Sequence, residues 1–263
     1  MSTATVEKID TTKPGVPLGR LVKVELRKMF DTRSGFWLMM SIGILAALAT
    51  IAVIAFAPDD IISYNSFGTA VGVPMAILLP VIAILSVTGE WSQRTGLITF
   101  TLVPHRGQVI WAKLIASVLV GVVSMFIAFA IGAVGNVVGA AVNGVDADWD
   151  VSFRQMIVII FANVLGLLVG FMLGVLIRNT PGAIVGYFVY SFVLPGILGA
   201  LAAFVEWFRD LQPWVDFGYA QTPLFDGASP TAEQWAQLGV SSLPWLVLPL
   251  AFGIWSVLRS EVK

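Results

Sequence analysis

The chain has 263 residues, of which 57% are hydrophobic and only 12% are charged, and its formal net charge is −1. Because soluble domains carry about 25% charged residues, this composition indicates an integral membrane protein. The near-neutral charge gives no bulk attraction to nucleic acid, and the absence of cysteine excludes disulfides and cysteine-ligated metal sites. With a single histidine, His105, the chain is expected to bind no metal or other cofactor itself.

Residues 1–17 are polar and rich in Ser, Thr, Lys, Pro and Gly, which predicts a disordered cytoplasmic tail without a cleavable signal peptide. Residues 18–263 are expected to form a single transmembrane domain, because no change of composition marks a second boundary.

Residues 18–30 have the pattern of an amphipathic helix. At about 100° per residue the apolar and basic residues fall on opposite faces: Leu18, Leu21, Val22, Leu26 and Met29 on one, and Arg20, Lys23 and Arg27 on the other. Such an interfacial helix, which also contains Lys28, is expected to lie in the headgroup layer with its cations near anionic lipid. Glu25 falls in the middle of the apolar face, so it either pairs with a cation or lies shallow enough to stay hydrated.

Six apolar runs are long enough to cross the membrane, since a core of about 30 Å takes about 20 helical residues. They cover residues 36–57, 67–88, 109–142, 153–177, 182–205 and 240–258. Pro74 and Pro80 predict a kink in the second run, and Pro195 predicts one in the fifth. The expected fold is therefore all-α, with six transmembrane helices.

Two runs carry glycines at helical spacing. Gly135 and Gly139 in the third run, and Gly166, Gly170 and Gly174 in the fourth, lie four residues apart. This spacing favours close packing between helices.

Residues 206–238 combine Trp, Phe and Tyr with acids and prolines. Aromatic residues at this density are typical of the membrane interface, so short surface or re-entrant helices are expected. They would either cap the outer mouth of a transport path or anchor the chain at the interface.

With six spans, both termini lie on one side of the membrane, together with 13 of the 15 basic residues. These are Lys8, Lys13, Arg20, Lys23, Arg27, Lys28, Arg33, Arg94, Arg106, Lys113, Arg178, Arg259 and Lys263. The positive-inside rule therefore predicts a multi-pass plasma membrane protein with cytoplasmic termini and a cytoplasmic segment between the second and third spans.

That segment, residues 90–113, is the strongest candidate for function. Thr95 to Leu102 can form about two helical turns, with Ser92 as a possible N-cap and Pro104 as the stop. Its apolar residues exceed what a solvated loop needs. They either press into a groove on a partner or pack back on the helix 18–30.

The chain lacks the residues of several common chemistries. The central parts of the spans hold no ionisable residue, which argues against a proton-coupled carrier but leaves sodium sites built from carbonyls open. There is no P-loop and no metalloprotease motif, so the chain is not expected to be an enzyme. A transporter of this kind would have to take its energy from a partner through the segment 90–113. We expect a single cytoplasmic charge cluster there, formed by Glu25, Glu90, Arg94, Arg106 and Lys113.

The sequence resembles the permease subunits of ABC-2 type transporters, particularly those of actinobacteria. The resemblance rests on Val24-Glu25-Leu26-Arg27-Lys28, Asp31-Thr32-Arg33, Glu90-Trp91-Ser92-Gln93-Arg94-Thr95-Gly96, Thr99-Phe100-Thr101-Leu102-Val103-Pro104 with Arg106, and Ala112-Lys113. It implies an exporter permease that pairs with a second permease and is driven by separate cytoplasmic ATPase subunits, which use the ATP and Mg²⁺.

In that family a coupling helix after the second span docks on the ATPase. The residues expected to couple the two subunits are Glu90, Arg94, Thr95, Gly96, Leu97, Phe100, Leu102, Pro104, Arg106 and Lys113. The alternative from another class is a non-transporting membrane anchor or assembly protein that recruits a cytoplasmic partner through the same segment.

Overall fold

The computed structural model describes residues 16–58, 61–92 and 106–259, apart from the side chains of Ser34 and Arg106. Within these ranges the secondary structure is helical and no β-strand occurs. Six stretches are long and apolar enough to cross a membrane: Gly35–Phe56, Tyr64–Ser92, Gly107–Asn143, Phe153–Ile177, Thr180–Phe204 and Ala232–Arg259. The predicted all-α membrane architecture is therefore confirmed.

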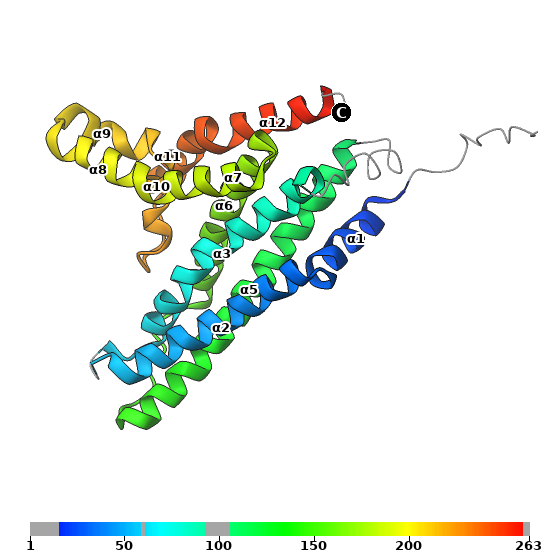
Figure 1. Ribbon diagram of the computed structural model, residues 1–263. Helices are drawn as coiled ribbons and strands as arrows, with labels where there is room; N and C mark the ends of the chain where they lie inside the picture. The colour runs from blue at the N-terminus through cyan, green and yellow to red at the C-terminus, as the bar shows by residue number, and fades with distance from the viewer. Residues whose placement is uncertain (1–15, 59–60, 93–105, 260–263) are drawn as a thin grey trace, which may run out of the picture.

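The first two thirds of the chain form an elongated bundle. Its helices are α1 (Leu18–Asp31), α2 (Arg33–Phe56), α3 (Tyr64–Ser92), α5 (Arg106–Asn143) and α6 (Phe153–Ile177). Helix α3 packs against α2, α5 and α6, and α1 lies at one end of the bundle (Figure 1). The core between α3 and α6 contains the buried side chains of Met75, Leu79, Leu167 and Phe171.

Glycines bring α3 close to its neighbours. A Cβ atom at Gly170 of α6 would lie 2.5 Å from the carbonyl oxygen of Pro80 in α3. A Cβ atom at Gly135 of α5 would lie 2.5 Å from Thr50 in α2 and 2.9 Å from the ring of Phe67 in α3. These two glycines therefore have the packing role that their spacing predicts.

Two π-helical turns interrupt the helices of the last third of the chain. Helices α7 (Thr180–Phe188) and α8 (Leu194–Phe204) are joined by the turn Val189–Val193, and α11 (Ala232–Ser242) and α12 (Leu248–Arg259) by the turn Leu243–Val247. Each turn ends two residues before a proline, Pro195 or Pro249. Because proline has no N–H to continue the ladder of hydrogen bonds, the kink predicted at Pro195 takes the form of this wider turn.

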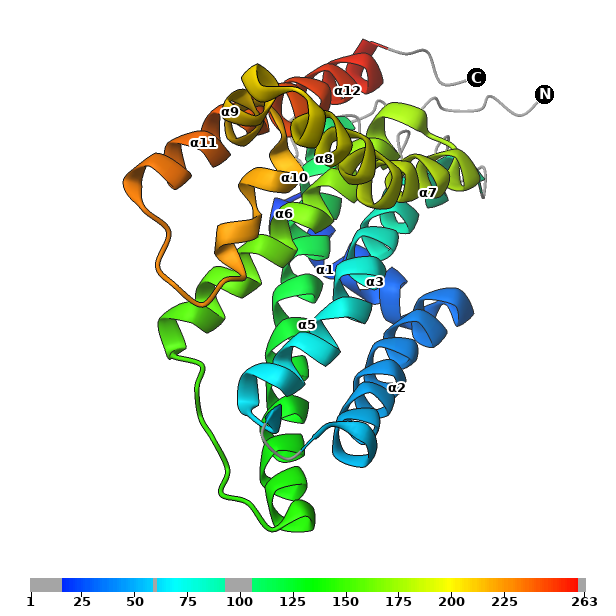
Figure 2. The ribbon, with the colours of Figure 1, turned by 90° about the vertical axis from the view of Figure 1, so that its left-hand side faces the viewer.

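Residues 206–238 form short helices, as predicted. They are α9 (Glu206–Val215), α10 (Phe217–Ala220) and the 3₁₀ turn Thr222–Leu224, followed by the start of α11. The sixth run begins at Ala232 and not at 240, because Thr231 and Gln234 form a capping box that starts the helix earlier. Helices α7, α8, α11 and α12 lie across one end of the bundle (Figure 2).

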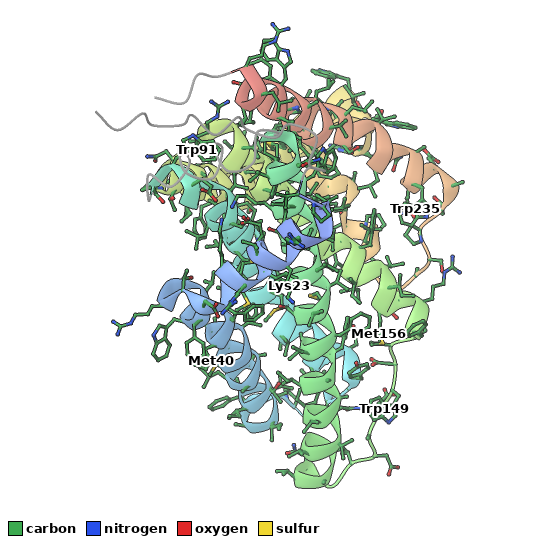
Figure 3. The ribbon with its side chains drawn as sticks, turned by 90° about the vertical axis from the view of Figure 1, so that its right-hand side faces the viewer. Lys23, Met40, Trp91, Trp149, Met156 and Trp235 are labelled. Atoms are coloured by element: carbon green, nitrogen blue, oxygen red, sulfur yellow. The ribbon has the colours of Figure 1, made fainter. Side chains whose placement is uncertain are left out.

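The two ends of the bundle differ in charge. Helix α1, the C-terminal end of α3, the N-terminal ends of α5 and α7 and the C-terminal end of α12 meet at one end, here called the basic end. At the opposite end an acidic loop is attached to α3: the Tyr64 N–H donates to Asp148 O at 3.0 Å, and the Asn65 N–H donates to Asp150 Oδ1 at 2.8 Å. Trp149 of this loop lies 5.3 Å from the Tyr64 ring and is labelled in Figure 3.

Candidate functional site

A tight bend joins α1 to α2 at the basic end. Only Thr32 separates the two helices, and its hydroxyl accepts a hydrogen bond from the Gly35 N–H at 3.1 Å, which caps α2. A Cβ atom at Gly35 would collide with the Met29 carbonyl, so this tight bend requires glycine. Helix α1 lies across α5, and its residues Val22, Leu26 and Met29 pack on the core.

A buried ion cluster joins α1, α3 and α5. The Lys113 Nζ lies 2.6 Å from Glu25 Oε2 and 3.0 Å from Glu90 Oε1. The Lys28 Nζ lies 2.8 Å from Glu25 Oε1 and 3.1 Å from Glu90 Oε1. Each lysine therefore bridges both glutamates, and the four charges sum to zero. We call these residues the ion cluster.

The burial of the ion cluster is uneven. Glu25, Glu90 and Lys113 are 6%, 4% and 4% exposed, whereas the side chain of Lys28 is 44% exposed. Removing one partner of a buried pair leaves an uncompensated charge and typically costs about 3–5 kcal/mol. Lys113 is thus the cation on which the two buried carboxylates depend most. The pair Arg27–Asp31 at 2.7 Å is 80% and 61% exposed, and it contributes little by comparison.

The pKa of Lys28 reflects its two neighbours. Burial lowers this pKa, but the hydrogen bond and charge of Glu25, together with those of Glu90, outweigh burial and raise the pKa above the usual 10.5. Lys28 is therefore protonated at neutral pH. Its contribution to stability is present there and is lost only as pH rises through the raised pKa.

Glu25 shows which of the two sequence interpretations holds. It is buried and paired, and not hydrated in a shallow position. The apolar face of α1 contacts α5 and α2. The face with Arg20, Lys23 and Arg27 is directed outward.

A second group of contacts holds the same end of α3 from the other side. Arg178, between α6 and α7, donates from Nη2 to Ser256 Oγ of α12 at 2.6 Å, and its guanidinium lies 6.0 Å from the centre of the Trp91 ring. The hydroxyls of Thr88 and Thr180 are 2.8 Å apart. Burial lowers the pKa of Arg178. Figure 3 labels Trp91 at this end of the molecule. We call these residues the arginine node.

The arginine node contains a backbone conformation that favours glycine. Arg178 has φ of 54°, in the left-handed region, where glycine has no steric cost.

We predict that Arg178→Gly unfolds at a higher temperature than Arg178→Ala. Both variants lose the side-chain contacts of Arg178, but only alanine keeps the steric cost of a left-handed φ, about 1 kcal/mol. Thermal unfolding in detergent measures this order. Arg154, in a regular helix, is the control and should show the opposite order; an Ala variant at 178 that is the more stable of the two would contradict the prediction.

The residues predicted to couple to a partner are only partly described. Arg94, Thr95, Gly96, Leu97, Phe100, Leu102 and Pro104 lie outside the described residues, and Arg106 is placed only as the first residue of α5. The structure does bring Glu25, Glu90 and Lys113 together, as the charge-cluster hypothesis requires. It adds Lys28, which the helical wheel assigned to neither face of the helix 18–30, and Arg178, which was only counted among the basic residues of the cytoplasmic side.

The ion cluster and the arginine node join helices at the basic end. Among the described residues no group of three or more His, Cys, Asp or Glu side chains could hold a metal ion. Glu90 in α3 and Lys113 in α5 flank the segment 93–105 in the sequence, and their contact at 3.0 Å, here called the base of that segment, joins the two helices. Through the ion cluster and the arginine node, this base is attached to α1, α5, α6, α7 and α12.

No protein-family model matches the chain, and no curated protein matches it.

Proposed function

We propose that this protein is the membrane-spanning permease subunit of a transporter, driven by a separate cytoplasmic ATPase that docks on residues 93–105. The six apolar helical stretches support membrane embedding. The sequence around the segment 90–113 supports the ATPase-coupled class through its resemblance to ABC-2 type permeases. Export, pairing with a second permease and a plasma membrane location with cytoplasmic termini belong to the same proposal.

One observation carries the proposal: the two helices that flank the segment 93–105, α3 and α5, are joined by a buried salt bridge, Glu90–Lys113. A segment that only connects two spans does not need a fixed base. A segment that transmits force does, because a push on it must move the spans and not merely deform the connection. Helix α3 is the element that such a push would move, and α3 packs on α2, α5, α6 and α7.

The test is co-purification followed by reconstitution. From native membranes, the tagged chain is expected to bring down an ATPase, and replacing 95–102 with a Gly-Ser segment of equal length should abolish the association. Glu90→Gln should keep the ATPase bound but lower ATP-driven export by about tenfold, as expected for the loss of one coupling contact. Arg154→Gln, an exposed cation at the opposite end, is the matched control and should change neither.

Two results would overturn the proposal. An association that survives replacement of 95–102, with export intact, would remove the coupling role of this segment. A bound partner without ATP-driven export in liposomes would favour the membrane anchor, whereas transport by the pure chain without ATP would favour a self-powered carrier.

A further inference from the structure

The outward side of α1 is a basic surface that the ion cluster does not use. Arg20, Lys23 and Arg27 are spaced three and four residues apart, lie on one side of the helix and are exposed. Val24 and Phe30 flank them and are also exposed. We call these five residues the outer face of α1. Lys23 is labelled in Figure 3, where α1 lies across α5.

Around the outer face, residues 18–33 carry more cations than acids, even without the residues of the ion cluster. Between 18 and 33, Lys28 is used by the ion cluster, which leaves four cations and one outward acid, a net charge of +3 (four minus one). Arg27 pairs with that acid, Asp31, in an exposed contact. Within the described part of the chain, Arg20, Lys23 and Arg33 have no ion-pair partner. The described residues therefore leave the positive charge of this surface without a neutralising carboxylate at Arg20, Lys23 and Arg33.

The connection to α2 fixes where this surface lies. Thr32 alone separates α1 from α2, and the span Gly35–Phe56 starts three residues later. The C-terminal end of α1 therefore adjoins the start of a span, and α1, about 21 Å long, lies across α5 at the basic end. Phe36 and Trp37, exposed at the start of α2, are residues typical of this boundary.

We propose that the outer face of α1 binds the headgroups of anionic phospholipids. Arg20, Lys23 and Arg27 would donate charge-assisted hydrogen bonds to the phosphates, while Val24 and Phe30 contact the adjoining glycerol and upper acyl groups. A lipid fits better than an acidic protein surface, because apolar side chains interleave with the cations and continue into the lipid-facing side of α2. This binding is electrostatic: the apolar face of α1 is occupied by α5 and α2, so α1 does not insert as a free amphipathic helix.

The position of the outer face links lipid to the ion cluster. Glu25 and Lys28 are on the same helix as Arg20, Lys23 and Arg27, and they hold its other side on α3 and α5. A lipid that binds only when α1 is docked stabilises the docked state by mass action. Anionic lipid is therefore expected to strengthen the attachment of α1 to the base of the segment 93–105. The lipid site itself does not depend on the proposed transport function.

The experiment compares lipid binding to the purified full-length chain in neutral detergent. Native mass spectrometry with added phosphatidylglycerol or phosphatidylcholine should show preferential retention of phosphatidylglycerol. Arg20→Gln, Lys23→Gln and Arg27→Gln combined should weaken it about 100-fold, since each cation near an anionic surface is worth about fivefold. Phosphatidylglycerol should also raise the unfolding temperature of the wild type and not of the triple variant. Arg154→Gln, exposed at the opposite end, is the matched control and should bind as the wild type does.

Three outcomes would overturn the inference. The first is equal binding of the two lipids by the wild type, and the second is an unchanged phosphatidylglycerol preference in the triple variant. The third is full competition by millimolar inorganic phosphate, which would make the surface a general anion site. If the triple variant keeps its lipid preference but loses a co-purifying cytoplasmic protein, the outer face is a protein-docking surface. Because all three substitutions are at exposed positions, a native circular dichroism spectrum is expected and secures the comparison.

Discussion

Lys113→Met is expected to lower the free energy of unfolding by about 3–5 kcal/mol, because it removes the buried cation shared by two buried carboxylates. Methionine keeps most of the apolar volume of the lysine stem, so the loss reports charge and not packing. Lys28 cannot replace Lys113, since Lys28 already binds both carboxylates from the solvent side. Reversible unfolding in mixed detergent micelles measures the effect.

Two control variants separate the effect of burial from the loss of a positive charge. Lys28→Met removes a cation that is half exposed, so its cost should be clearly smaller, and Arg27→Met breaks only an exposed pair and should cost under about 1 kcal/mol. The double variant Glu25→Gln with Lys113→Met should lose less than the sum of its single changes, because both remove the same contact at 2.6 Å. Equal costs for Lys113, Lys28 and Arg27 would show that burial does not set the energy of the ion cluster.

The sequence is sufficient to locate the spans because hydropathy is a local property. The six predicted runs differ from the observed helices mainly at their ends. The clearest difference, the early start of α11, had a visible signal: Thr231 and Gln234 have the spacing of a capping box, but they lie in a polar stretch that hydropathy alone assigns to a loop. Local hydrogen-bonding chemistry, and not hydrophobicity, sets that boundary.

The ion cluster shows where sequence reasoning stops. The helical wheel places Glu25 on an apolar face and so requires a partner, but it cannot choose one, because Lys113 is 88 residues away. That choice depends on how α1 crosses α5 after the bend at Thr32 and Gly35. Arg178 is similar: its partners Ser256 and Trp91 come from α12 and α3. Contacts between distant elements follow from the fold and not from spacing.

The glycine series separates two positions that look equivalent in sequence. Gly166 and Gly170 are one helical turn apart on α6, and both are predicted to pack closely. In the structure a Cβ atom at Gly170 would lie 2.5 Å from Pro80 O and 2.7 Å from Pro80 Cα, whereas the nearest atom to one at Gly166 is 4.0 Å away. The atoms facing Gly170 belong to the backbone of α3, so no side chain can rotate aside to accept a methyl group.

Gly170→Ala is therefore expected to separate α3 from α6 locally and to lower the free energy of unfolding by about 1–3 kcal/mol, the usual cost of overpacking. Gly166→Ala should stay within about 0.5 kcal/mol of the wild type, since alanine adds helix propensity without a close contact. The same unfolding assay measures both variants, and each adds one methyl group to the same helix. If both variants behave alike, the approach of α6 to Pro80 is looser than described. If only Gly170→Ala is destabilising, the α3–α6 contact is rigid at Pro80, and displacement of the basic end of α3 must then carry α6 along with it.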